Sequence, residues 1–216
     1  MFLSCMGDFN PILSEVIDMA KILYTYQGNV YVNLTNRCDC NCRFCIRTHH
    51  QGVGDAQSLW LEKEPGLEEV KAAIDAYDFA GKEELVYCGY GEPTCALDVL
   101  VESAKHAKAT YGLKIRVNTN GLGNLYYNRD IVPELAEVVD TVSISLNAPT
   151  KEEYMDVTRP QFENAYEGML DFAKECGKVI PDVKFTVVDV LTEEQIEASC
   201  RLAESQGIQL RVRPFV

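Results

Sequence analysis

The residues best suited to chemistry are four cysteines within one short segment: Cys38, Cys40, Cys42 and Cys45. Thiolates are soft ligands that suit iron–sulfur clusters and zinc. Structural zinc needs four ligands, commonly two pairs a dozen or more residues apart, and here His49 and His50 would have to complete the set. Three thiolates on one loop would instead hold a cubane cluster with one iron free for another ligand. The spacing favours the cluster and leaves zinc open.

Three polar segments further along the chain each follow a short run of β-branched and apolar residues. In the first, residues 88–94, two glycines would let a ligand approach the backbone closely. The second is residues 118–121, and the third contains Ser143, Ser145 and Asn147. A glycine-rich or Asn-Gly segment alone indicates only a turn. Because ligands bind at the carboxyl ends of parallel strands, we expect the three segments to form one site.

Short apolar runs alternate with longer helical patterns along the chain. The expected strands are Val30–Leu34, Leu85–Cys88, Lys114–Asn118, Thr141–Leu146, Val183–Val188 and Gln209–Arg213. The expected helices are Leu67–Phe79, Ala96–Thr110, Asp130–Val138, Glu163–Cys176 and Glu193–Glu204. Such alternation predicts a parallel sheet with right-handed crossovers, and six units fit a partial barrel or an open doubly wound sheet. Residues 22–26 add a strand before a hairpin turn at Gln27-Gly28-Asn29.

Several expected strands alternate apolar with polar residues. Parallel strands buried on both faces usually read as unbroken apolar runs, so one face of this sheet should meet water or a ligand. Four cations fall on the polar side: Arg116, Lys184, Arg211 and Arg213. Either Glu84 and Glu92 balance them, or a substrate carboxylate or phosphate does. An anionic substrate is therefore a hypothesis from the pattern.

Composition limits the function classes. The chain has 216 residues and a net charge of −13, which opposes broad binding of nucleic acid or an anionic membrane. No apolar run approaches the roughly 18 residues of a membrane span, and the first residues lack the features of a signal peptide, so we expect a cytoplasmic protein. The odd count of 9 cysteines argues against a disulfide framework. Residues 1–18 are expected to be an N-terminal extension and residues 19–216 one core domain.

The cysteine segment resembles the radical S-adenosylmethionine (SAM) signature, Cys-x3-Cys-x2-Cys with an aromatic residue, here Phe44, before the last cysteine. The resemblance implies a partial (β/α)6 TIM-like barrel, with SAM as cofactor. It implies that Cys38, Cys42 and Cys45 hold a 4Fe–4S cluster and that Cys40 does not. The SAM-binding residues that it implies are Gly89, Tyr90, Gly91, Glu92, Asn118, Thr119, Ser145 and Asn147. It assigns no catalytic side chain, and residues 187–190 lack the family's glycine-containing adenine motif.

Within this superfamily the chain looks most like the small TatD-associated radical SAM proteins. The matching stretches are residues 31–38 and 145–150, followed by Arg159-Pro160. The resemblance implies reductive cleavage of SAM to a 5′-deoxyadenosyl radical, which abstracts hydrogen from an unidentified substrate, anionic or macromolecular by hypothesis. It also implies an electron donor such as flavodoxin or ferredoxin, and the open barrel edge could take a protein partner. The rival interpretation is a non-catalytic module that binds zinc or an iron–sulfur cluster.

Overall fold

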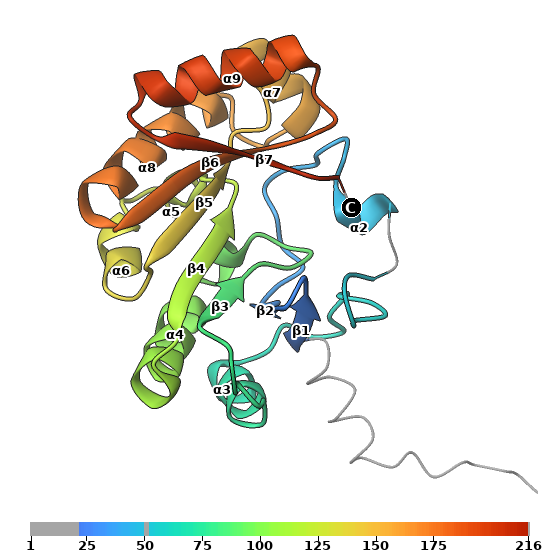
Figure 1. Ribbon diagram of the computed structural model, residues 1–216, viewed down its shortest axis with the longest axis vertical. Coiled ribbons are helices and arrows are strands. Elements are labelled where there is room, and N and C mark those ends of the chain that lie inside the picture. Colours follow the sequence, from blue (N-terminus) through green and yellow to red (C-terminus); the bar gives the residue numbers. More distant parts are fainter. Residues whose placement is uncertain (1–21, 50–51, 216) are drawn as a thin grey trace, which may run out of the picture.

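The computed structural model describes residues 22–49 and 52–215, without the side chain of His49. One sheet of seven strands runs through it in the order β1-β2-β3-β4-β5-β6-β7 (Figure 1). The strands are β1 Leu23–Tyr26, β2 Asn29–Val32, β3 Glu84–Tyr87, β4 Lys114–Thr119, β5 Thr141–Ser145, β6 Asp182–Val188 and β7 Gln209–Arg213. The expected extension, residues 1–18, lies outside the described residues.

The first two strands form the expected hairpin. β1 pairs antiparallel with β2, whereas every later neighbouring pair of strands is parallel. Gln27 and Gly28 have φ values of 48° and 82°, the left-handed values that a two-residue type I′ turn requires. All six expected parallel-sheet strands are present, with ends displaced by no more than two residues.

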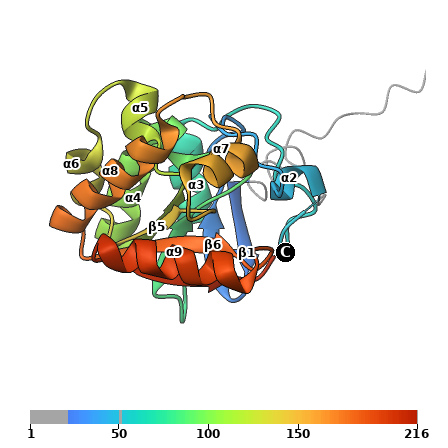
Figure 2. The same ribbon diagram turned by 90° about the horizontal axis from the view of Figure 1, so that it is seen from above.

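Helices occupy the segments between the strands. They are α2 Ile46–His49, α3 Leu67–Asp75, α4 Leu97–Tyr111, α5 Gly123–Tyr127, α6 Val132–Ala136, α7 Lys151–Thr158, α8 Ala165–Val179 and α9 Glu193–Ser205, with the 3-10 turn η1 Pro93–Ala96. The long helices lie along the outer side of the curved sheet (Figures 1 and 2). Helices α2, α5 and α7, which have four, five and eight residues, were not predicted from the sequence.

The alternation of side chains along the strands has the predicted consequence. Val117, Val142 and Phe185 point outward and are fully buried in the main core with residues of the long helices. The intervening residues point to the concave side, where Asn118, Ser143 and Lys184 are aligned by the strand register. The sheet is therefore apolar on its convex face and polar over much of its concave face.

One end of the concave face departs from this expectation. A second hydrophobic cluster covers it beside β1, β2 and β3, and consists of Tyr24, Tyr31, Val53, Leu59, Val86 and Tyr90. The Tyr24 and Tyr31 rings stack with their centroids 5.1 Å apart. The Tyr24 hydroxyl donates to the carbonyl of Cys88 at 3.2 Å. The concave face thus has an aromatic end and a polar end.

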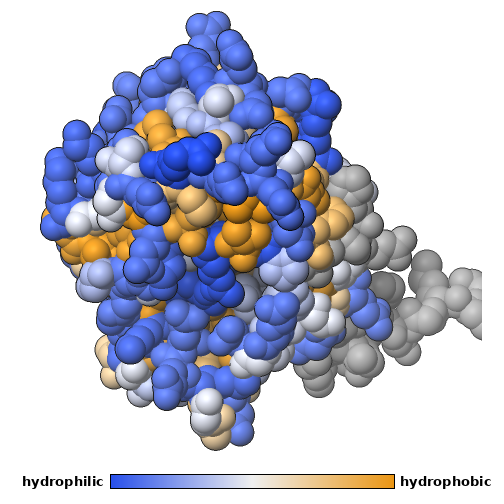
Figure 3. Space-filling model, turned by 45° about the horizontal axis from the view of Figure 1, so that its top comes forward, coloured by the Kyte–Doolittle hydropathy of each residue, from blue (hydrophilic) through white to orange (hydrophobic). Residues whose placement is uncertain are grey.

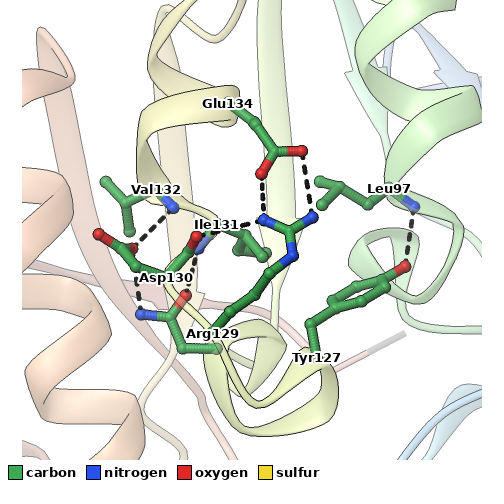
Figure 4. Close-up of polar contacts among 8 residues, drawn as sticks. Leu97, Tyr127, Arg129, Asp130, Ile131, Val132 and Glu134 are labelled. Carbon is green, nitrogen blue, oxygen red and sulfur yellow. Dashed lines mark hydrogen bonds and ion pairs between the residues drawn. The ribbon is translucent and has the colours of Figure 1, made fainter.

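Polar contacts fix the turn between α5 and α6 (Figure 4). The Asn124 side-chain oxygen accepts from the Ile131 amide at 2.9 Å, and Asp130 accepts from the Val132 amide at 3.0 Å, at the start of α6. Arg129 pairs with Glu134 across the same turn. Both helices belong to the connection from β4 to β5, so these contacts hold that connection in place.

Candidate functional site

A cavity of about 310 Å³ opens at the carboxyl ends of the strands. The cysteine loop after β2, the ends of β3, β4 and β5, and the concave sides of β6 and β7 all line it. Of the site residues expected from the sequence, ten line the cavity: Cys38, Cys42, Cys45, Gly89, Gly91, Glu92, Asn118, Thr119, Ser145 and Asn147. Tyr90 does not, because its ring packs against Trp60 with the centroids 5.2 Å apart.

Backbone contacts shape the cysteine loop. The Asn41 amide donates to the Thr158 carbonyl at 3.0 Å, and the Arg43 amide donates to the Val157 carbonyl at 2.9 Å, so the loop lies against the end of α7. Asp39, which is 2% exposed, accepts a hydrogen bond from the Asn120 side chain. The loop is therefore tied both to α7 and to the segment that follows β4.

The four thiols of the loop differ in environment. All four line the cavity, but Cys38, Cys42 and Cys45 are half-buried, whereas Cys40 is buried and its backbone forms an isolated β-bridge with Pro160. Interaction with the Cys38 and Cys42 thiols raises the pKa of Cys40. The same interaction with Cys40 lowers the pKa of Cys42, and burial raises that of Cys45.

The glycines of residues 88–94 face protein rather than open space. A Cβ on Gly91 would lie 2.2 Å from the Thr35 carbonyl oxygen, and one on Gly89 would lie 2.0 Å from the Asn33 side-chain oxygen. The Glu92 amide also donates to the Arg37 carbonyl at 2.7 Å. From the sequence, these glycines were expected to let a ligand approach the backbone. In the structure, the segment that leads into the cysteine loop approaches them closely.

Gly91→Ala should therefore destabilise the fold. The new methyl group would overlap backbone atoms of residues 35 and 37, which no side-chain rotation relieves, so we expect a loss of about 2–4 kcal/mol. Thermal unfolding measures it, with Gly177→Ala as the control, since a Cβ there meets nothing within 4 Å. Equal melting temperatures for the two variants would contradict this packing.

Glu92 is a buried carboxylate without a cationic partner among the described residues. Its Oε1 accepts from the Thr119 hydroxyl at 2.7 Å and from the Thr94 hydroxyl at 2.8 Å, and its Oε2 accepts from the Asn120 amide at 2.7 Å. Burial raises the pKa of Glu92 to about 7, although these hydrogen bonds oppose the shift. The Thr119 hydroxyl thus binds Glu92.

Two amide side chains in the cavity have an unused oxygen. The Oδ1 atoms of Asn118 and Asn147 are buried and have no hydrogen-bond partner among the described residues. Buried polar atoms without a partner are costly and point to a missing ligand. Ser145, the last residue of β5 and two residues before Asn147, also lines the cavity.

The comparisons with known proteins decide the family. The family model "Radical SAM superfamily" matches residues 32–203, most of the chain. This chain belongs to the radical SAM superfamily. Membership implies a 4Fe–4S cluster and SAM as cofactors. No curated protein matches the chain significantly.

Solved structures show the same fold for this radical SAM protein. Streptococcus suis SuiB bound to S-adenosylmethionine is 15% identical with a TM-score of 0.61, covering 100% of this chain and 47% of that one. Methylornithine synthase (PylB) is 15% identical with a TM-score of 0.60, covering 94% and 56%. Native anSMEcpe with bound AdoMet is 16% identical with a TM-score of 0.59, covering 86% and 50%. The chain spans about half the length of these proteins.

The donor set of the radical SAM protein fits both cofactors. Three half-buried thiols of one loop border the cavity, where Glu92 and the unused oxygens of Asn118 and Asn147 also lie. No three His, Cys, Asp or Glu side chains in residues 22–49 and 52–215 are grouped to hold a single metal ion. A cubane does not require such a grouping, because each thiolate binds a different iron.

Several side chains that line the cavity were given no role from the sequence. Cys88, Tyr24 and Tyr31 are lining residues, and Cys88 lies directly after β3. The sequence did carry a signal for Tyr24, because Tyr24 and Tyr26 alternate with Leu23 and Thr25 in β1.

None of the described helices is long and apolar enough to cross a membrane.

Proposed function

We propose that this protein is a radical SAM enzyme in which Cys38, Cys42 and Cys45 hold a 4Fe–4S cluster. When bound, the cofactors supply an electron for cleavage of SAM and a 5′-deoxyadenosyl radical that abstracts hydrogen from the substrate. The observation that carries this proposal is the convergence of three half-buried thiols and the Glu92 carboxylate on one cavity.

The chain's own groups would then bind and orient SAM. Glu92 would accept from the SAM ammonium group, since its ionised form is a buried anion without a protein cation among the described residues. Asn118 and Asn147 would accept from ribose hydroxyls with their unused oxygens, and Ser145 lies beside them. For Gly89, Tyr90 and Gly91 only backbone contacts with SAM are proposed, because the glycines have no side chain and the Tyr90 ring lies outside the cavity.

Reduced, cluster-loaded protein should convert SAM to 5′-deoxyadenosine and methionine, slowly in the absence of substrate. The reaction is measured by chromatography after anaerobic reduction with dithionite. The Cys38→Ala variant is the matched control and should give only background product. Absence of 5′-deoxyadenosine from protein that holds about four irons per chain would contradict the proposed activity.

The rival candidate is a non-catalytic module that binds zinc or an iron–sulfur cluster. Its zinc form named His49 and His50, whose side chains lie outside the described part of the structure. Metal content distinguishes the two, because a zinc module would be colourless and would hold one zinc ion per chain. A cluster protein without the SAM-cleaving activity would bind iron but leave SAM intact.

We further propose a protein partner at the open edge of the barrel. Val190, Val212 and Phe215 are 52%, 42% and 44% exposed, and they lie on or beside the edge strand β7. Figure 3 shows hydrophobic residues gathered in a band across one otherwise hydrophilic face. An electron donor such as flavodoxin or ferredoxin is one proposed partner.

Two narrower assignments are also proposals. Residues 31–38 and 145–150 support a place among the TatD-associated radical SAM proteins. A cytoplasmic location is supported by the eight free cysteines in the described residues, which suit a reducing compartment.

A further inference from the structure

The cavity holds arginine charge that the described protein groups do not balance. Arg116, Arg211 and Arg213 all line it. Arg116 pairs with Glu84 at 2.9 Å, so a protein carboxylate balances this cation, as one of the two expectations from the sequence had it. Lys184 pairs with Asp182 at 2.7 Å and does not line the cavity. Two of the four expected free cations are therefore paired, and Arg211 and Arg213 are left.

Arg211 and Arg213 have no ion pair with a carboxylate of the described residues. The Nε of Arg213 is buried and has no hydrogen-bond partner there. Burial lowers the pKa of Arg213, and the nearby positive charges of Arg211 and Arg116 add to this effect. The Arg213 guanidinium stays protonated, so its charge cannot be lost and an anion should offset it. Arg211 is exposed to water and lies two residues away on the same side of the strand, where it can contact the same anion.

The Glu92 carboxylate, which also lines the cavity, does not supply that anion. Both carboxylate oxygens of Glu92 accept hydrogen bonds from Thr94, Thr119 or Asn120, and none from an arginine. SAM carries two cationic groups and one carboxylate. Its single carboxylate can offset at most one of the two arginines.

Arg211 and Arg213 lie on the edge strand β7, whereas the cysteines lie on the loop that follows β2. Register pairs Arg211 with Thr186 and Arg213 with Val188, on the concave side of the edge strand. Tyr31 of β2 and Cys88, which follows β3, line the same cavity as Arg213. A ligand bound here would have the stacked tyrosines Tyr24 and Tyr31 as an apolar wall.

We propose that Arg211 and Arg213 bind a carboxylate or phosphate group of a small substrate inside this cavity. The proposal names the substrate class for the function proposed above and rests on it. The planar fork of arginine binds both kinds of oxyanion with two parallel hydrogen bonds. The cavity of about 310 Å³ would also hold SAM, which leaves room beside it only for a small substrate group.

Direct binding tests the proposal. Cluster-loaded protein with SAM is titrated calorimetrically with sodium phosphate and with sodium succinate, against sodium chloride at equal ionic strength. Wild type should bind at least one of the two anions, and the preferred one identifies the group. The double variant Arg211→Gln, Arg213→Gln should bind it at least tenfold more weakly. The control Arg201→Gln removes one positive charge from α9, where the side chain is 67% exposed, and should bind like wild type.

Two further measurements separate this proposal from its alternatives. Uncoupled formation of 5′-deoxyadenosine should be unchanged in the double variant, whereas its parallel loss would show that the arginines bind SAM and would overturn the proposal. Anion-free Arg213→Gln should melt no lower than wild type, because an unbalanced buried charge is removed. A lower melting temperature would mean that Arg213 is structural. If wild type binds neither anion, or if the double variant binds as tightly as wild type, the proposal is also overturned. Neither outcome bears on SAM cleavage, which is measured separately.

Discussion

Replacing Cys38, Cys42 or Cys45 with alanine should remove the cluster, from about four irons per chain to background. Each of these thiols is half-buried at the cavity. Loss of one of the three proposed ligands leaves a cubane with two open corners, which the loop should not retain. Iron analysis and the visible absorbance of anaerobically purified protein measure the result.

Cys40→Ala is the matched control, since Cys40 lies in the same loop. Its backbone bridges to Pro160, and its side chain is buried, 3.6 Å from the Asn120 side-chain nitrogen. The variant should keep its iron and lose at most modest stability. Iron lost from Cys40→Ala but kept by Cys38→Ala would overturn the assignment of ligands.

The affinity for SAM should fall as the pH is lowered from 8 to 6. The pKa of Glu92 is raised to about 7 by burial, so the carboxylate is ionised above pH 7 and protonated below it. Only the ionised form attracts the SAM ammonium group. The affinity should fall up to about tenfold for each pH unit below 7. Equilibrium binding of SAM to the unreduced protein measures this dependence.

Glu92→Gln should weaken SAM binding at pH 8 by about tenfold or more, and the remaining affinity should not follow this pH dependence. The control is Glu175→Gln, on the exposed side of α8, where the carboxylate pairs only with Lys178. The control should bind SAM as tightly as wild type. A wild-type affinity that is constant between pH 6 and 8 would show that Glu92 does not meet the ammonium group.

The sequence by itself determined the strands, the β1–β2 hairpin and the loop that carries the cysteines. These features are local: side-chain alternation in a strand has a period of two, and a two-residue turn needs particular backbone angles at Gln27 and Gly28. The same alternation predicted that Asn118 and Ser145 lie on the polar face of the sheet, and both line the cavity in the structure. Parallel topology then brought the strand ends together.

Only the tertiary structure decided which polar groups are already engaged. Thr119 follows the predicted strand, yet its hydroxyl is bound to Glu92, which lies 27 residues earlier in the chain. Arg116 pairs with Glu84 on the neighbouring strand, whereas Arg213 has no carboxylate partner among the described residues. Gly91 packs on backbone of the cysteine loop. Contacts of this kind depend on the curvature of the sheet and on distances between strands, which residue type and spacing along the chain do not specify.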